Sequence, residues 1–150
     1  LSGQLKFPAT QNPSANGNTL DDYEEGTWTP TVMFAGVTTG ITYTSRAGTY
    51  VKVGQMLYLD GNFRLSSKGA ATGEAQITTP FTFSTEAGAV LNYCGGMSSI
   101  TGTIVTWVQS ATLKWRVNSS TNGTVNTSLT DANFGNTSEI FFSMVGRVSQ

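Results

Sequence analysis

Short runs of β-branched and aromatic residues, punctuated by Gly and Asn, make up most of the chain after Thr27. Such runs are typical of strands, and a series of them is typical of an all-β sandwich or barrel. The sequence therefore predicts an antiparallel β-sandwich of the jelly-roll kind. The predicted strands are Thr27–Phe34, Ile41–Thr44, Gly48–Val53, Met56–Leu65, Glu74–Thr78, Ala89–Gly95, Thr103–Val108, Ala111–Val117 and Glu139–Val148.

Glycines and short polar pairs indicate how some of these strands connect. Gly54-Gln55 stands between two apolar runs and predicts a two-residue hairpin turn, with Gly first as primed turns require. Gln109-Ser110 predicts a second hairpin of the same length. Gly61 interrupts an alternating run, which indicates a β-bulge or a close backbone approach, and the Gly95-Gly96 pair is a looser sign of the same kind.

The segment before the strands has a different composition. Residues 1–18 are rich in Gln, Asn, Ser and Gly and carry two prolines, so we expect a linker that leads from a preceding shaft or catalytic domain, with the sandwich domain at 19–150. Thr19 can cap one short helical turn that the acidic residues after it favour and that Gly26 ends. Pro30 donates no backbone hydrogen bond and predicts an edge strand. Because the chain begins with Leu1, we expect it to be a fragment of a longer polypeptide.

Charge restricts the partners of the chain. Charged residues make up 11% of it, against about 25% in typical domains, and the net charge is −1. Without a basic cluster, the sequence argues against binding to nucleic acid, and without a long apolar run it argues against membrane insertion. A net charge near zero permits self-association. We expect the single cysteine, Cys94, to be a buried and inert thiol.

The sequence holds no histidine, which excludes Ser-His-Asp and Cys-His nucleophiles and zinc sites that need imidazole. Asp21, Asp22, Glu24 and Glu25 form the one acidic cluster. Paired carboxylates can cleave glycosides or bind calcium, but neighbours on one short turn do not flank a sugar ring and the calcium-loop spacing is absent. We therefore expect a solvated helix start or a polar contact between subunits, and we predict no cofactor, no metal and no catalytic residue.

Aromatic and amide side chains suggest a carbohydrate-binding surface, because sugars stack on aromatic rings and hydrogen-bond to amides and hydroxyls. At least half of the aromatic residues should instead fill the core. Trp107 and Trp115 lie on neighbouring predicted strands, where cross-strand pairing is the alternative role. The segment 118–126 is almost entirely Ser, Thr, Asn and Gly and predicts a loop. The candidate sugar-binding residues are Trp107, Trp115, Asn118, Asn122, Asn126 and Tyr93.

Several stretches resemble one domain family. Leu5–Gln11 and Thr19–Pro30 resemble the beginning of a C-terminal domain of tail fibres and tailspikes of tailed bacteriophages and prophages. Gly48–Gly54 and Ile77–Phe81 resemble later parts of that domain, as does the apolar strand that follows Asn136–Ile140. Residues 82–135 carry no such resemblance.

The resemblance implies a homotrimeric β-sandwich at the distal end of a virion tail fibre or spike. Such a domain contacts polysaccharide of the bacterial surface, as capsule or lipopolysaccharide, or helps the trimer assemble. A purely structural clamp without sugar binding is the alternative. A third possibility is a polysaccharide-degrading enzyme with carboxylates brought together across subunits, although in this family the catalytic part precedes the domain.

Overall fold

The computed structural model describes residues 3, 6–8, 10, 14, 16, 19, 22–100, 103–108, 114–120 and 127–149, with the backbone alone for Thr103, Trp107 and 114–120. Strands dominate this part of the chain, and one 3-10 turn, η1, covers Asp131–Asn133. No helix in the described ranges has the length and apolar character of a membrane span. The strands are β1 (Tyr23–Trp28), β2 (Val32–Phe34), β3 (Ile41–Val53), β4 (Met56–Lys68), β5 (Ala75–Thr78), β6 (Ala87–Met97), β7 (Thr103–Val108), β8 (Lys114–Ser120), β9 (Thr127–Ser128) and β10 (Phe134–Arg147).

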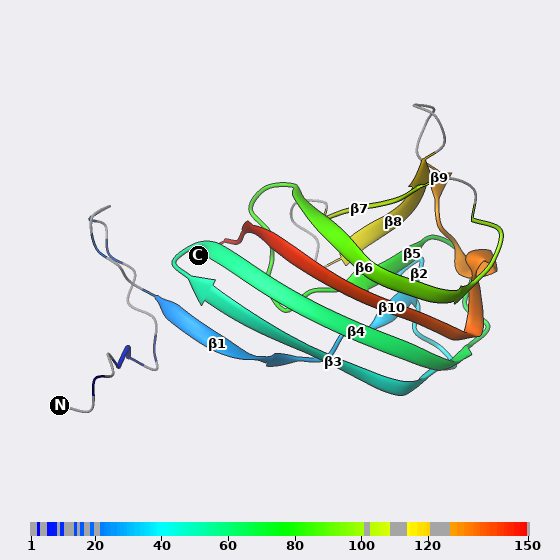
Figure 1. Cartoon of the computed structure of the whole chain (residues 1–150), viewed down its shortest axis with the longest axis horizontal. Helices are drawn as coiled ribbons and strands as arrows, with labels where there is room; N and C mark the ends of the chain where they lie inside the picture. Colours follow the sequence, from blue (N-terminus) through cyan, green and yellow to red (C-terminus); the bar gives the residue numbers. More distant parts are fainter. Residues whose placement is uncertain are drawn as a thin grey trace.

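The strands form two layers that are joined at one corner (Figure 1). Hydrogen bonds connect them in the order β1-β3-β4-β10-β6-β7-β8-β5-β2, and β9 pairs with β8. We call β1, β3, β4, β10 and β6 the first sheet, and the remaining strands the second sheet. All pairs are antiparallel. The predicted all-β antiparallel sandwich is therefore confirmed.

The hairpin at Gly54-Gln55 is confirmed, since Val53 pairs with Met56 across it. Gly54 has a φ of 56°, which a residue without Cβ adopts at little cost. The second predicted hairpin is wrong, because Val108 pairs with Trp115 and not with Ala111, as a two-residue turn would require. The predicted loop over 118–126 is wrong for residues 118–120, which belong to β8, and residues 121–126 lie outside the described part of the chain. Two predicted strands are continuous in β3, where irregular pairing between Thr42 and Ser45 takes the place of a loop.

The predicted helical turn after Thr19 is wrong. β1 begins at Tyr23 and pairs along its full length with β3, so that Gly26 lies inside a strand. The capping signals in the sequence are local, whereas a strand at this position gains a ladder of hydrogen bonds to residues 48–53. The short helical turn of this fold is η1, which follows Thr130.

The predicted strand Thr27–Phe34 is divided at Pro30. β1 ends at Trp28 and β2 begins at Val32, and these two strands form the opposite ends of the strand order. Both are edge strands, as expected for a chain that lacks the Pro30 N–H. Residues 29–31 carry the chain from the first sheet to the second, and Arg46 holds them by donating to the Pro30 carbonyl (3.3 Å) and the Thr31 hydroxyl (2.9 Å).

The core lies between the sheets and is rich in phenylalanine. The alternating burial of β4 and β10 shows which residues face inward. Its largest fully buried side chains come from both layers and from the loop before β6: Phe34, Phe63, Phe83, Phe142, Leu57, Leu59, Leu65, Ile77, Ile140, Met144 and Val32.

Two glycines opposite each other on β3 and β4 make room for Trp28. Gly48 pairs with Gly61, and the Trp28 indole N–H donates to the Asp60 carbonyl at 3.0 Å. A Cβ at Gly61 would lie 2.6 Å from Phe142 and 3.1 Å from Trp28. Neither the bulge nor the close backbone approach predicted at Gly61 is found, because the pairing there is regular and the atoms nearest to an added Cβ belong to side chains. Gly96 does lie at an irregularity between β6 and β10, with a φ of 65°.

Replacing Gly61 by Ala should lower the free energy of unfolding by about 1–3 kcal/mol, because the added methyl group overpacks the contact with Phe142 and Trp28. Gly88→Ala is the matched control, since a Cβ at this β6 glycine meets nothing within 4 Å. Its effect should stay within about 0.5 kcal/mol. Urea unfolding measures both variants, and equal effects would contradict the packing described here.

Candidate functional site

The acidic cluster contains one buried ion pair. The Asp22 carboxylate accepts from the Lys52 ammonium, and the two side chains are only 5% and 3% exposed. Asp22 has a φ of 65°, which Asp tolerates better than most residues. Its carbonyl accepts from the Gly54 N–H at 2.9 Å. The expectation that the cluster is solvated is therefore wrong for Asp22, which ties the beginning of β1 to the β3–β4 hairpin.

The next two carboxylates point to opposite faces of β1. Glu24 accepts from the Tyr50 hydroxyl at 2.5 Å on the inner side, and Glu25 accepts from the Tyr23 hydroxyl at 2.6 Å on the outer side. The hydrogen bond to Glu24, with burial and the negative charge, raises the pKa of Tyr50 to about 12. Carboxylates on opposite faces cannot act together on one ligand. Among the described residues no three His, Cys, Asp or Glu side chains gather in a way that could hold a metal ion.

The outer face of the first sheet is unusually apolar. We define the outer face as the side chains of β1, β3, β4, β10 and β6 that point away from the core. Tyr58 is 48% exposed and lies directly opposite Val51 on one side and Val145 on the other. Phe141 lies opposite Tyr93, with ring centroids 5.8 Å apart in an edge-to-face arrangement. The large apolar residues of the outer face are Tyr23, Val51, Val53, Met56, Tyr58, Val90, Tyr93, Phe141 and Val145.

One polar island interrupts this face. The Asp60 carboxylate accepts from the hydroxyl and the N–H of Thr49, at 2.9 and 3.2 Å. Beside it, a shallow hollow of about 400 Å³ lies between β1 and β3, lined by Glu25, Gly26, Thr27, Thr49, Tyr50 and Val51.

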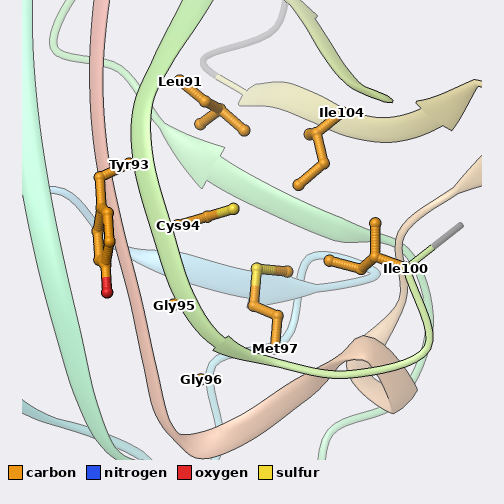
Figure 2. A pocket seen from close by; sticks show the side chains of 8 residues that line it. All are labelled: Leu91, Tyr93, Cys94, Gly95, Gly96, Met97, Ile100 and Ile104. Atoms are coloured by element: carbon orange, nitrogen blue, oxygen red, sulfur yellow. The ribbon is translucent and has the colours of Figure 1, made fainter. Parts of the chain in front are cut away.

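A second hollow lies where the two sheets separate. β6 pairs with β7 only over Ala87–Ala89 and then diverges from it. The gap is a groove of about 520 Å³, and Figure 2 shows Leu91, Met97, Ile100 and Ile104 pointing into it from its two sides. Tyr93 also borders the groove, but its ring lies on the other side of β6, toward β10 (Figure 2). The groove is thus an apolar opening toward the core.

Cys94 also lines this groove. Its side chain is exposed, so the prediction of a buried thiol is wrong. Cys94 pairs with the buried Ile140 and therefore occupies an inward position of β6. It stays accessible because β7 has already diverged from β6 at this level.

The structure separates the candidate sugar-binding residues. Tyr93 is 53% exposed on the outer face of the first sheet. Trp107 pairs with Arg116 and Trp115 with Val108, so the two tryptophans occupy opposite faces of the β7–β8 ribbon and their predicted cross-strand pairing is wrong. Trp115 shares its face with the buried Val108 and Ile77.

The position of Trp107 is on the other face, away from the core. The neighbouring residues Thr106 and Val108 are buried, and Val105 is 40% exposed. Asn118 pairs with Val105 and so shares that face with Trp107. Asn122 and Asn126 lie outside the described residues. Trp107 and Asn118 are therefore the two candidates that the backbone brings together, on the outer side of the second sheet.

Sequence reasoning missed the apolar outer face, although the sequence contains a sign of it. From Tyr50 to Leu59, large apolar or aromatic residues occupy both odd and even positions. A strand exposed on one face should alternate with polar residues, whereas a strand covered on both faces should not. This stretch has the pattern of strands that are covered on both sides.

No protein-family model and no curated protein matches this sequence. Among solved structures, the chain is similar in fold to the crystal structure of the Dettilon tailspike protein, with a TM-score of 0.70 and 16% sequence identity. The similarity covers 85% of this chain and 24% of the tailspike chain, so this chain spans about a quarter of that protein's length. At this identity the likeness establishes the shared fold.

Removing one partner of the Asp22–Lys52 pair should lower the free energy of unfolding by about 3–5 kcal/mol, because the other charge stays buried and unpaired. In Asp22→Asn with Lys52→Met the combined loss should be clearly smaller than the sum of the single losses. Arg64→Met is the control, because the Arg64–Glu139 pair is more exposed, at 53% and 23%, and its loss should cost at most about 1 kcal/mol. Additive effects in denaturant titrations would contradict a coupled pair.

The Tyr50–Glu24 hydrogen bond should make stability fall at high pH. The pKa of Tyr50 is raised from its ordinary value of 10.0 to about 12. The contribution of this hydrogen bond to the free energy of unfolding is therefore complete below pH 10, and it is lost as the pH rises toward 12. Tyrosinate absorbance should show a group that ionises near pH 12, and Glu24→Gln should shift this transition to lower pH. Glu25→Gln is the control and should leave this transition unchanged, since Glu25 bonds Tyr23 on the other face.

Proposed function

We propose that this chain is the distal domain of a phage tail fibre or tailspike, which helps three copies assemble and binds polysaccharide of the bacterial surface. The similarity in fold to a tailspike supports the setting in a virion tail. The observation that carries the assembly role is the apolar outer face, because water-exposed patches of this extent mark interaction sites. Our proposal assigns no reaction to this chain.

The polysaccharide role is assigned to the other side of the molecule. Trp107 and Asn118 occupy positions on the outer side of the second sheet. The sequence that follows, 118–128, is rich in hydroxyl and amide groups, which suit uncharged sugar hydroxyls. Three sites on one trimer would strengthen weak single contacts through avidity.

A purely structural assembly domain is the second candidate. It is favoured by the contrast between the large apolar outer face and the hollow of about 400 Å³ between β1 and β3, which is shallow for a ligand site. The two candidate functions differ in one measurable property. Capsule or lipopolysaccharide of the host should retain the protein if it binds polysaccharide, and should not retain it if its role is purely structural. An enzymatic role would instead release new reducing ends from the polysaccharide.

Trp107→Ala should weaken retention on host polysaccharide by roughly tenfold, the effect of losing about 1.4 kcal/mol per site, while stability stays unchanged. Trp115→Ala is the matched variant and should change stability rather than retention. It should lower the free energy of unfolding by about 3–5 kcal/mol, because its position is on the core face. A glycan array and surface-bound host polysaccharide measure the binding. If Trp107→Ala is retained on the polysaccharide as strongly as the wild type, this sugar site is rejected. If the wild type itself is not retained, the purely structural role is favoured.

A further inference from the structure

We infer that the outer face of the first sheet is the surface through which copies of this chain contact one another. This inference rests on the proposed function and names the place of its assembly contact. Of the eleven large hydrophobic residues that are exposed in the described part of the chain, nine lie on this face. The remaining two, Val37 and Val105, lie apart from it.

The apolar residues form a connected surface across neighbouring strands. Val51, Tyr58 and Val145 are direct cross-strand partners on β3, β4 and β10. Next to this row, Val53 pairs with Met56 and with Tyr23. Directly opposed side chains in a sheet lie about 5 Å apart and pack together. These residues form one connected patch from β1 to β10. Beyond the polar row of Thr49, Asp60 and Ser143, the Phe141–Tyr93 pair carries the apolar surface on to β6.

The chemistry of this face fits protein better than sugar. Five of its nine large apolar side chains are valine or methionine, which provide no flat ring for stacking and no group for a sugar hydroxyl. Of its aromatic residues, Tyr93 and Phe141 pack on each other, and the Tyr23 hydroxyl is already bonded to Glu25. The Asp60 carboxylate is already bonded to Thr49 on both of its oxygens. Flat sheet faces, by contrast, pack well on other sheets through interdigitating apolar side chains.

The size and the margins of the face fit a contact between copies. At about 3.3 Å per residue and about 4.8 Å between strands, it covers on the order of 600 Å², close to the roughly 800 Å² that one partner contributes to a standard interface. Polar groups border the apolar patches, with Arg64 and Glu139 at one end and Arg147 bonded to Gln55 at the other, and the internally bonded Thr49–Asp60 pair lies between the patches. Apolar patches inside a polar rim are the usual anatomy of a protein interface.

A second and a third copy of this chain are therefore the occupants. Three first sheets that turn their outer faces toward a common axis bury the same residues in every copy, as closed cyclic symmetry requires. The net charge of −1 offers little repulsion to this arrangement.

The test compares lysine substitutions on the two outer sides of the 150-residue chain. Tyr58→Lys with Val145→Lys should raise the concentration for half-assembly by roughly a hundredfold, because it places charges in an apolar contact. Val51→Lys and Val105→Lys form a matched pair, as these strand valines are 37% and 40% exposed on opposite sheets. Only Val51→Lys should weaken assembly. Light scattering and sedimentation report the mass, and urea midpoints confirm that each variant is folded.

Each outcome decides between surfaces. A wild-type trimer that the folded outer-face variants leave intact rejects the inference while the proposed function stands. If Cys94→Arg, in the groove between β6 and β7, dissociates the trimer instead, the contact lies at the groove. A wild type that is monomeric at all concentrations rejects both this inference and the assembly role. Polysaccharide retention, which the Trp107 variant tests, is scored separately.

Discussion

The packing of Trp28 against a pair of opposed glycines is the contact on which the rest of this fold depends. Gly48 and Gly61 face each other on β3 and β4, and together they leave a space that the indole fills. The indole N–H is bonded to the Asp60 carbonyl, and its ring meets Phe142 edge-on at 6.0 Å. Trp28 is the last residue of β1, so this contact fixes the point at which the chain leaves the first sheet.

That point determines the topology. After Trp28 the chain crosses to the second sheet at Pro30, which is buried and has no N–H to pair. The Val32 N–H then donates to the Tyr43 hydroxyl at 2.8 Å, so β3 also positions the start of β2. Trp28 and Pro30 thus direct β1 and β2, which are neighbours in the sequence, to the opposite ends of the strand order. The core forms between the two sheets.

Local signals in the sequence were sufficient where the structure is local. Gly54 marks its hairpin correctly because a two-residue turn depends on its own residues. The helical turn after Thr19 failed because pairing of β1 with distant residues of β3 outweighs capping. The relation of Trp107 to Trp115 depends on cross-strand register, in which Val108 pairs with Trp115. The outer face is not predicted, because apolar residues on both sides of a strand indicate that both sides are covered but do not say what covers them.

The two outer sides of the sandwich differ in a way that suits the two roles we propose. Apolar residues gather on the first sheet, where β3, β4 and β10 are long and regularly paired over most of their length and present a broad surface. The second sheet is built from shorter strands, and its connections are rich in Ser, Thr and Asn. A broad, rigid surface suits contact between copies, because little conformational entropy is lost there on assembly. Short strands with polar connections tolerate sequence change better, and the glycan-binding surface that we propose would need that tolerance to match a particular host.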